Sequence, residues 1–326
     1  MTTSEPRLSA STSKPIRLGI SSCLLGEEVR FDGGHKRDAY IISTLGRWFE
    51  FVSVCPEVAI GMPIPRQPIR LVKVGDDVRV RGVKDSSIDV TQPLTDFGHE
   101  MTARLTDLCG YLFKRGSPTC GMERVKVYAE NGQPAQRGVG AYSKIFMSAY
   151  PLLPCEEEGR LGDPVLRENF IERVFVYHRW QELLRSGLSA HKLVQFHTEH
   201  KFQVLAHNQS AYRRMGRLVA QAGSSPLESL AARYGAELMC ALARRATRRS
   251  HTNVLQHLFG FVSDRLDAGD RAEMLELIEQ YRRELVPLVV PLTLLRHHFR
   301  RHPDPYVERQ HYLSPHPQEL ALRNLV

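Results

Sequence analysis

The stretch IRLGISSCLLG (residues 16–26) decides the fold of the amino-terminal half. Its apolar run is too short for a helix and too apolar for a surface strand, so it predicts a buried strand of a parallel sheet. FEFVSVCPE (49–57) and YLFKRGSPTCG (111–121) repeat this pattern, in which a short apolar run leads into a turn that carries a cysteine. Ligands bind in the crevice at the carboxyl edge of such a sheet. We therefore expect the three cysteines to share one site.

Length and composition indicate a globular protein with two domains. The chain has 326 residues, a net charge of +8 and a pI near 9.3, and its hydrophobic content is that of an ordinary globular protein. No stretch approaches the roughly 18 consecutive apolar residues of a membrane helix. Residues 1–14 resemble a disordered tail and no secretory signal. We expect a cytoplasmic protein without membrane contact, where thiols stay reduced and six cysteines indicate metal binding or catalysis rather than disulfides.

Short strands alternate with helical stretches up to about residue 155, which is typical of an α/β domain with a Rossmann-like parallel sheet. We place this domain at residues 15–158. One hairpin is predicted at 69–82, where Gly75-Asp76 supplies the turn, and another near Asn131-Gly132. The other expected strands are 16–22, 50–54, 110–114 and 151–155, and the expected helices are 37–48, 94–109 and 140–149.

The remaining residues, 159–326, are predicted to form an all-helical domain. Asp163-Pro164 fits a helix start, because aspartate caps a helix and proline is tolerated in its first turn. Breaks between helices are expected at Ser186-Gly187, Gly223-Ser224 and Gly269-Asp270.

The chemistry of the amino-terminal domain centres on thiolates. Cysteine thiolates are soft ligands that suit zinc, copper(I) or iron–sulfur clusters. Cys23, Cys55 and Cys120 are separated by 32 and 65 residues, which excludes CxxC zinc ribbons and the close-set cysteines of ferredoxins. For any single cysteine, a small buried hydrophobe is the alternative interpretation. We adopt that interpretation for Cys109 and Cys240 and leave Cys155 open.

Polar residues gather around the three turns. Glu57 follows Cys55 by two positions, where a carboxylate could orient water, although a solvated surface glutamate is the alternative. Paired glycines at 33–34 let backbone N–H groups approach an anion, and a plain tight turn is the alternative. The candidate substrate-binding residues are Ser22, Asp32, Gly33, Gly34, Lys36, Arg66 and Lys114.

Three motifs in order resemble the iron–sulfur-dependent thiouracil and thiouridine desulfidases: SSCLLGEEVRFDGGHK (21–36), CPEVAIGMPIPRQPIRL (55–71) and GSPTCG (116–121). The resemblance covers roughly residues 15–155. It implies a [4Fe-4S] cluster held by the three cysteines, with the fourth iron free. It also implies acid/base and proton-handling roles for Glu57 and Ser117. Relatives often carry Ser-Ser-Pro-Ser where this chain has Gly116-Ser117-Pro118-Thr119, and Ser117 is retained.

The helical half resembles a domain of long-unassigned function that occurs alone or fused behind such desulfidases, through KFQVLAHNQSAYRRMGRLVA (201–220) and HYLSPHPQEL (311–320). The fused members resemble desulfidases that act on thiolated tRNA. Arginine binds phosphates bidentately and stacks on bases, although solvated helix faces also carry many arginines. The candidate RNA-binding residues are Arg213, Arg214, Arg217, Arg244, Arg245, Arg248 and Arg249. We interpret His197, His200 and His207 as surface or hydrogen-bonding histidines and not as a second metal site.

These features together predict a hydrolase that converts 4-thiouridine in tRNA to uridine with water and releases hydrogen sulfide, without net electron transfer. Two alternatives stay open. In the first alternative the protein is a desulfidase of free thiouracil. In the second it is a non-catalytic iron–sulfur sensor that binds nucleic acid. The sequence does not indicate an oligomeric state.

Overall fold

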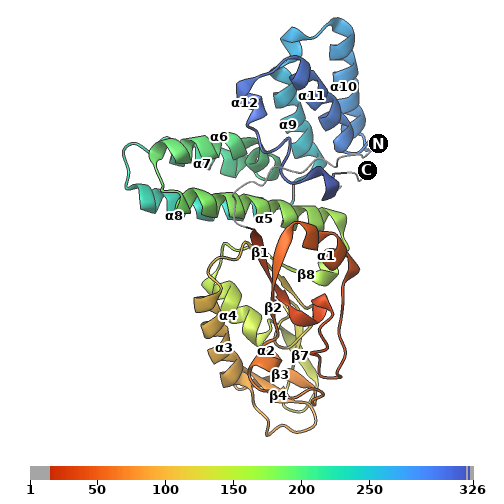
Figure 1. The fold of residues 1–326 in the computed structure, drawn as a ribbon, viewed down its shortest axis with the longest axis vertical. Helices are drawn as coiled ribbons and strands as arrows, with labels where there is room; N and C mark the ends of the chain where they lie inside the picture. Colours follow the sequence, from red (N-terminus) through yellow and green to blue (C-terminus); the bar gives the residue numbers. More distant parts are fainter. Residues whose placement is uncertain (1–14, 321, 324–326) are drawn as a thin grey trace, which may run out of the picture.

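A four-stranded parallel sheet forms the centre of the amino-terminal domain in the computed structural model, which describes residues 15–320 and 322–323. Its strand order is β2 (Phe49–Val54), β1 (Ile16–Ser21), β5 (Gly110–Phe113) and β8 (Cys155–Glu157), and every neighbouring pair is parallel. The predicted fold class, an α/β domain followed by helices, is confirmed (Figure 1). The tail predicted at residues 1–14 lies outside the described residues.

A second four-stranded sheet lies beside the first. The hairpin β3 (Ile69–Val74) and β4 (Asp77–Gly82) confirms the predicted turn at Gly75-Asp76, and β6 (Val125–Tyr128) pairs antiparallel with β7 (Pro134–Gly138) around Asn131-Gly132. The two hairpins join through parallel pairing of β3 with β6, which gives the order β4-β3-β6-β7. Sequence analysis predicted both hairpins but not this union.

The helices of the α/β domain partly follow the expected ranges. α3 (Thr91–Arg104) and α4 (Ala141–Ala149) lie side by side, and α2 (Pro56–Ala59) is one turn after β2. The helix predicted at 37–48 is much shorter, because α1 covers only Ala39–Ser43 and a 3-10 turn follows at Leu45–Arg47. The predicted helix at 94–109 begins earlier and ends earlier, so that residues 105–109 lead into β5.

Eight helices are described beyond the sheet. They are α5 (Pro164–Arg185), α6 (Ala190–His207), α7 (Gln209–Val219), α8 (Leu227–Ala243), α9 (Arg248–Gly260), α10 (Ala268–Arg282), α11 (Val289–Arg301) and α12 (Pro305–Glu308). Asp163 caps α5 as predicted, since its side chain accepts hydrogen bonds from the N–H groups of Val165 and Leu166. None of the described helices has the length and apolarity to span a bilayer.

The long helix α5 packs against the amino-terminal ends of the parallel strands (Figure 1). The ring of Phe49, the first residue of β2, lies 5.5 Å from that of Phe175. A Cβ on Gly110, the first residue of β5, would lie 2.8 Å from a methyl group of Val174. One hydrophobic core therefore runs from the sheet into α5, α6 and α8, and a second core fills the space among α6 and α9–α12. Helix α5 and the cysteine loops therefore occupy opposite ends of the parallel sheet.

Candidate active site

A cavity of about 340 Å³ opens at the carboxyl edge of the parallel sheet. Cys23, Cys55 and Cys120 all line it. Cys23 lies in the 3-10 turn after β1, Cys55 directly follows β2, and Cys120 lies in the loop after β5. Because the strands are parallel, their carboxyl ends meet at one edge, and three loops far apart in sequence reach the same cavity.

The loop that carries Cys120 is fixed by the start of α4. The backbone N–H of Ala141 donates to the carbonyl oxygen of Pro118, and that of Tyr142 donates to the carbonyl oxygen of Thr119, each at 3.0 Å. A Cβ at Gly140 would lie 2.5 Å from the Thr119 carbonyl oxygen, a distance that no side chain tolerates. Glycine is therefore required where helix and loop meet, and the position of the thiol is set by backbone contacts.

The three thiols are neutral groups in the absence of a metal. Burial raises the pKa of Cys23 to about 11 and that of Cys120 to about 12, and it also raises the pKa of Cys55. A bound metal reverses this preference, because a coordinating thiol loses its proton. An all-sulfur donor set of buried cysteines suits a soft metal centre.

The spacing of the donors also bears on the kind of centre. Within the described ranges, no three His, Cys, Asp or Glu side chains converge closely enough for one metal ion. A cubane does not require that convergence, since each thiolate binds its own iron. The residues present fit an iron–sulfur cluster held by three cysteines.

Glu57 is held by a buried arginine at the wall of the cavity. Arg66 Nε and Nη2 donate to Glu57 Oε2 at 2.9 and 2.7 Å, and Nη2 also donates to the carbonyl oxygen of Val29 at 2.8 Å. The Arg66 side chain is only 3% exposed and that of Glu57 14%. This pairing leaves Glu57 Oε1 for other hydrogen bonds and fixes the orientation of the carboxylate, which a solvated surface glutamate would lack.

Thr119 connects Glu57 with Ser117. Its hydroxyl donates to Glu57 Oε1 at 2.8 Å, and it lies 2.8 Å from Ser117 Oγ. Ser117 Oγ also accepts hydrogen bonds from the backbone N–H groups of Thr119 and Cys120. With these bonds satisfied, the Ser117 hydroxyl donates to Thr119, and Thr119 donates to the carboxylate. Sequence analysis missed Thr119, although a hydroxyl residue directly before a proposed metal ligand is a detectable signal.

The comparisons with known proteins match both halves of the chain. The profile of the family described as "2-thiouracil desulfurase" matches residues 18–158. "Uncharacterized protein YbgA" of Escherichia coli (strain K12) is 32% identical over 153 residues, which are 47% of this chain and 90% of the relative. The chain belongs to the 2-thiouracil desulfurase family. A second profile, described as "protein of unknown function (DUF1722)", matches residues 201–317, so the desulfurase domain is followed by a DUF1722 domain.

Two further proteins each match less than half of this chain. "Uncharacterized protein YbbK" of Bacillus subtilis (strain 168) is 30% identical over 108 residues, which are 31% of this chain and 71% of the relative. A solved structure titled "[4Fe-4S]-dependent thiouracil desulfidase TudS" is 25% identical, covers 45% of this chain and 94% of its own, and has a TM-score of 0.36.

The desulfurase domain brings together only some of the predicted substrate-binding residues. Asp32 and the two glycines after it are not among the residues that line the cysteine cavity, and Asp32 Oδ1 accepts a hydrogen bond from the N–H of Gly34 within its own turn. Lys114 reaches the cavity, where its ammonium pairs with Glu158. The predicted substrate-binding residues that line the cavity are Ser22, Lys36, Arg66 and Lys114.

The predicted RNA-binding arginines lie on α7, after α8 and at the start of α9. Two of them are engaged inside the domain, because Arg214 pairs with Glu237, and Arg248 lies over the ring of Tyr281 at 4.6 Å. The other five predicted RNA-binding arginines are exposed, and none has a carboxylate within 4 Å in the described part of the chain. They are Arg213, Arg217, Arg244, Arg245 and Arg249.

The other cysteines and the three histidines take no part in the cavity. Cys109 is buried with its sulfur 3.6 Å from His178 Nδ1, Cys155 begins β8, and Cys240 is exposed on α8. The histidines form hydrogen bonds, as one of the sequence interpretations held. His197 bonds to the Tyr234 hydroxyl, His200 to the Phe196 carbonyl and His207 to the Arg244 carbonyl.

Proposed function

We propose that this protein removes sulfur from 4-thiouridine in tRNA, yielding uridine and hydrogen sulfide, with a [4Fe-4S] cluster held by Cys23, Cys55 and Cys120. The observation that carries the proposal is the cavity itself. Three buried thiols share it with an oriented carboxylate and a chain of hydroxyl groups. The family to which the chain belongs is described as acting on a thiolated pyrimidine, which supports the reaction type.

The reaction is a hydrolysis in which water replaces sulfur at the ring carbon. A C–O bond forms, the C–S bond breaks, and the two protons of water leave with the sulfur as hydrogen sulfide. No electrons are transferred. The cluster, when bound, supplies an open iron that acts as a Lewis acid toward the thiocarbonyl sulfur.

The protein's own residues handle the proton. Glu57, held in place by Arg66, accepts a proton from the attacking water as a general base. Its contact with Thr119 offers that proton a path away from the carboxylate, through Thr119 to Ser117. Ser117 then returns the proton to the departing sulfur. The hydrogen bonds that join Glu57, Thr119 and Ser117 reverse their donor and acceptor roles as the proton passes.

Charge supports tRNA as the substrate. The chain carries a net charge of +8, and five of the predicted RNA-binding arginines are exposed without carboxylate partners among the described residues. These arginines lie in the helical region beyond α5. Helix α5 contacts the amino-terminal ends of the strands, whereas the cysteine cavity lies at the carboxyl ends. A bound tRNA would have to contact both parts of the molecule at once, with the thiolated nucleotide turned out of its stack.

A desulfidase of free thiouracil is the second candidate, and the family's description favours it. The cavity holds the reacting groups within the desulfurase domain alone, so a free base needs no other part of the chain. Deleting the helices is a poor test, because the core of the sheet continues into Phe170, Ile171 and Val174 of α5. Full-length protein has to be used.

The deciding experiment is anaerobic reconstitution of the full chain, followed by incubation with thiolated tRNA and with free 4-thiouracil. Nucleoside analysis of the tRNA and assay of released sulfide measure both reactions. Loss of 4-thiouridine with stoichiometric sulfide supports the proposal. Turnover of the free base alone favours the second candidate, and tight RNA binding without sulfide from either substrate indicates a sensor.

A further inference from the structure

A row of basic side chains crosses one face of the second sheet. In the antiparallel ladders, Lys126 of β6 lies directly opposite Arg137 of β7, and Arg70 of β3 lies directly opposite Arg81 of β4. The parallel register that pairs Leu71 with Val127 sets Arg70 next to Lys126. Four cations therefore stand in line across four strands. With strands about 4.8 Å apart, the row spans about 14 Å.

This row is poorly compensated within the protein. In the described part of the chain, no carboxylate lies within 4 Å of the charged nitrogens of Arg70, Lys126 or Arg137, and only Arg81 reaches one, Asp89 at 3.6 Å. The Nε atom of Arg70 is buried and has no hydrogen-bond partner there. Like charges directly opposite each other destabilise a sheet. The arrangement is unfavourable for the free protein and favourable for an anion bound along the row.

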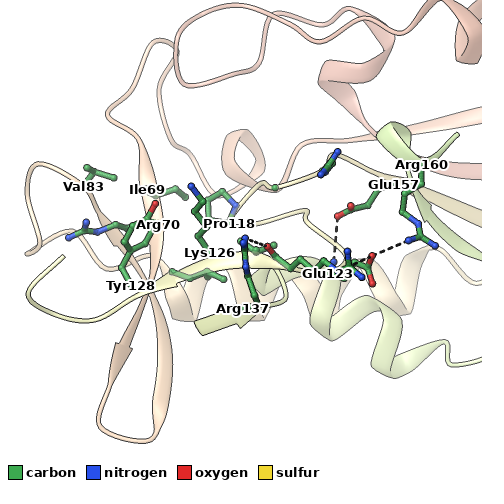
Figure 2. Close-up of a pocket in the computed structure, with 15 residues that line it drawn as sticks. Ile69, Arg70, Val83, Pro118, Glu123, Lys126, Tyr128, Arg137, Glu157 and Arg160 are labelled. Atoms are coloured by element: carbon green, nitrogen blue, oxygen red, sulfur yellow. Dashed lines mark hydrogen bonds and ion pairs between the residues drawn. The ribbon is translucent and has the colours of Figure 1, made fainter. Parts of the chain in front are cut away.

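Most of the row lines a groove of about 810 Å³ (Figure 2). Arg70, Lys126 and Arg137 lie in the groove, and Arg115, Gly116 and Pro118 line both the groove and the cavity. The groove and the cavity are therefore lined by the same residues of the loop that carries the third cysteine.

The acidic residues of the groove, Glu123 and Glu157, lie toward the end away from Arg70, and both already have partners within the protein. Glu123 Oε1 pairs with Arg160 at 3.1 Å, and Glu157 Oε1 accepts the backbone N–H of Met122 at 2.9 Å (Figure 2). At the end formed by β3 and β6, the Arg70 guanidinium lies 5.1 Å from the ring centroid of Tyr128. That end combines uncompensated cations with an aromatic side chain, the combination with which proteins hold single-stranded nucleic acid.

We infer that this groove binds consecutive phosphates of the polynucleotide strand whose thiolated base enters the cysteine cavity. The inference rests on the proposed function only in assigning the reacting base to that cavity. Arginine and lysine along a line match the repeating charge of a sugar–phosphate chain. A free base has no group to place in the groove, and a mononucleotide has one phosphate for the three cations that line it. The groove thus selects a strand over its monomers.

The test compares Lys126→Glu with Lys73→Glu in the full-length protein. Both lysines are exposed residues of the second sheet, but Lys73 lies opposite Val78 and outside the groove. Fluorescence anisotropy measures binding of a short unmodified single-stranded RNA across a range of salt concentrations. We expect Lys126→Glu to weaken binding about tenfold and to lower the salt slope by about 1. Lys73→Glu should stay within about twofold of the parent protein. Equal affinity of the two variants would overturn the inference.

Two further readouts complete the test. Binding of uridine 5′-monophosphate should be almost unchanged in Lys126→Glu, and a loss as large as that for RNA would replace the strand with a single-phosphate site. The melting temperature of Lys126→Glu should rise by about 1–3 °C, because a carboxylate then faces Arg137 and Arg70. A reconstituted protein without turnover, whose Lys126→Glu variant still loses RNA affinity, would refute the proposed reaction and leave the groove assigned.

Discussion

Thr119 Oγ1 donates a hydrogen bond to Glu57 Oε1 across 2.8 Å, although 62 positions separate the two residues in the chain. The contact joins the loop after β5 to the start of α2, and it places the Thr119 hydroxyl between the carboxylate and Ser117. No direct hydrogen bond joins the two predicted catalytic residues in the described structure. In the proposed mechanism a proton passes between them through Thr119.

The first prediction concerns this hydroxyl. Thr119→Val keeps the shape of the side chain and removes the relay, so we expect kcat on free 4-thiouracil to fall by about 10- to 100-fold. Thr119→Ser restores a hydroxyl and should retain activity within about threefold. Iron content has to be equal in both variants, which separates a proton-transfer effect from loss of the cluster. Equal activity of the valine variant and the parent protein would remove Thr119 from the mechanism.

The second prediction concerns the buried ion pair between Arg66 and Glu57. Arg66→Met leaves a carboxylate that is 14% exposed without its partner, and we expect the free energy of unfolding to fall by about 3 kcal/mol. The double variant Arg66→Met/Glu57→Gln carries no orphaned charge and should recover part of this loss. Urea denaturation of the metal-free protein measures both. Additive losses in the double variant would show that the pair is not coupled.

Local patterns predicted the individual elements well, because the apolar runs of β1, β2 and β5 are short, continuous and followed by turn residues. These local patterns do not predict which strands pair with each other in the tertiary structure. Nothing in 69–82 or 125–138 indicates that β3 pairs with β6, since that pairing joins two hairpins separated by a helix and a strand. The row of basic residues could not be predicted from the sequence for the same reason, because it forms only when the four strands pair in this register.

The candidate site was predicted in part. Turn cysteines after buried strands pointed to one edge of the sheet, and three of them do line one cavity. Asp32 and its neighbouring glycines were included because glycine pairs often cradle anions, but here the turn satisfies its own groups. The boundary at residue 158 separates α/β from helical sequence, yet the hydrophobic core crosses it. Composition marks where the secondary structure changes and not where packing stops.

The third prediction distinguishes the cavity cysteines from the others. Substitution of Cys23, Cys55 or Cys120 by alanine should each reduce bound iron and acid-labile sulfide to less than about a fifth of the parent level after anaerobic reconstitution, because a cluster with two protein ligands is labile. Cys240→Ala is the matched control, since Cys240 is exposed on α8 and far from the cavity lining. Unchanged iron in any of the three cavity variants would remove that cysteine from the ligand set.

The fourth prediction concerns the stability of the helical domain below neutral pH. Burial lowers the pKa of His251 and His311 to about 3 and that of His197 and His316 to about 4. These histidines stay neutral in the folded protein, whereas the unfolded chain binds protons below about pH 6.5. Stability from this source is complete above pH 6.5 and is lost as the pH falls toward 4, by up to about 1.4 kcal/mol per pH unit for each histidine.

His207 acts in the opposite sense. Burial alone would lower its pKa, but the carboxylate of Glu172, which lies 3.5 Å from His207 Nε2, raises it above the ordinary value. Its contribution is present below pH 6.5 and is lost as the pH rises through the raised pKa. Thermal unfolding should therefore show a maximum near pH 6.5–7, with a steep acid side and a shallow alkaline side. His251→Gln should lower the slope of stability against pH on the acid side by the contribution of about one proton. Glu172→Gln should remove the decline of stability on the alkaline side. A melting temperature that rises steadily from pH 7 to pH 5 would contradict the assignment of these histidines as neutral buried groups.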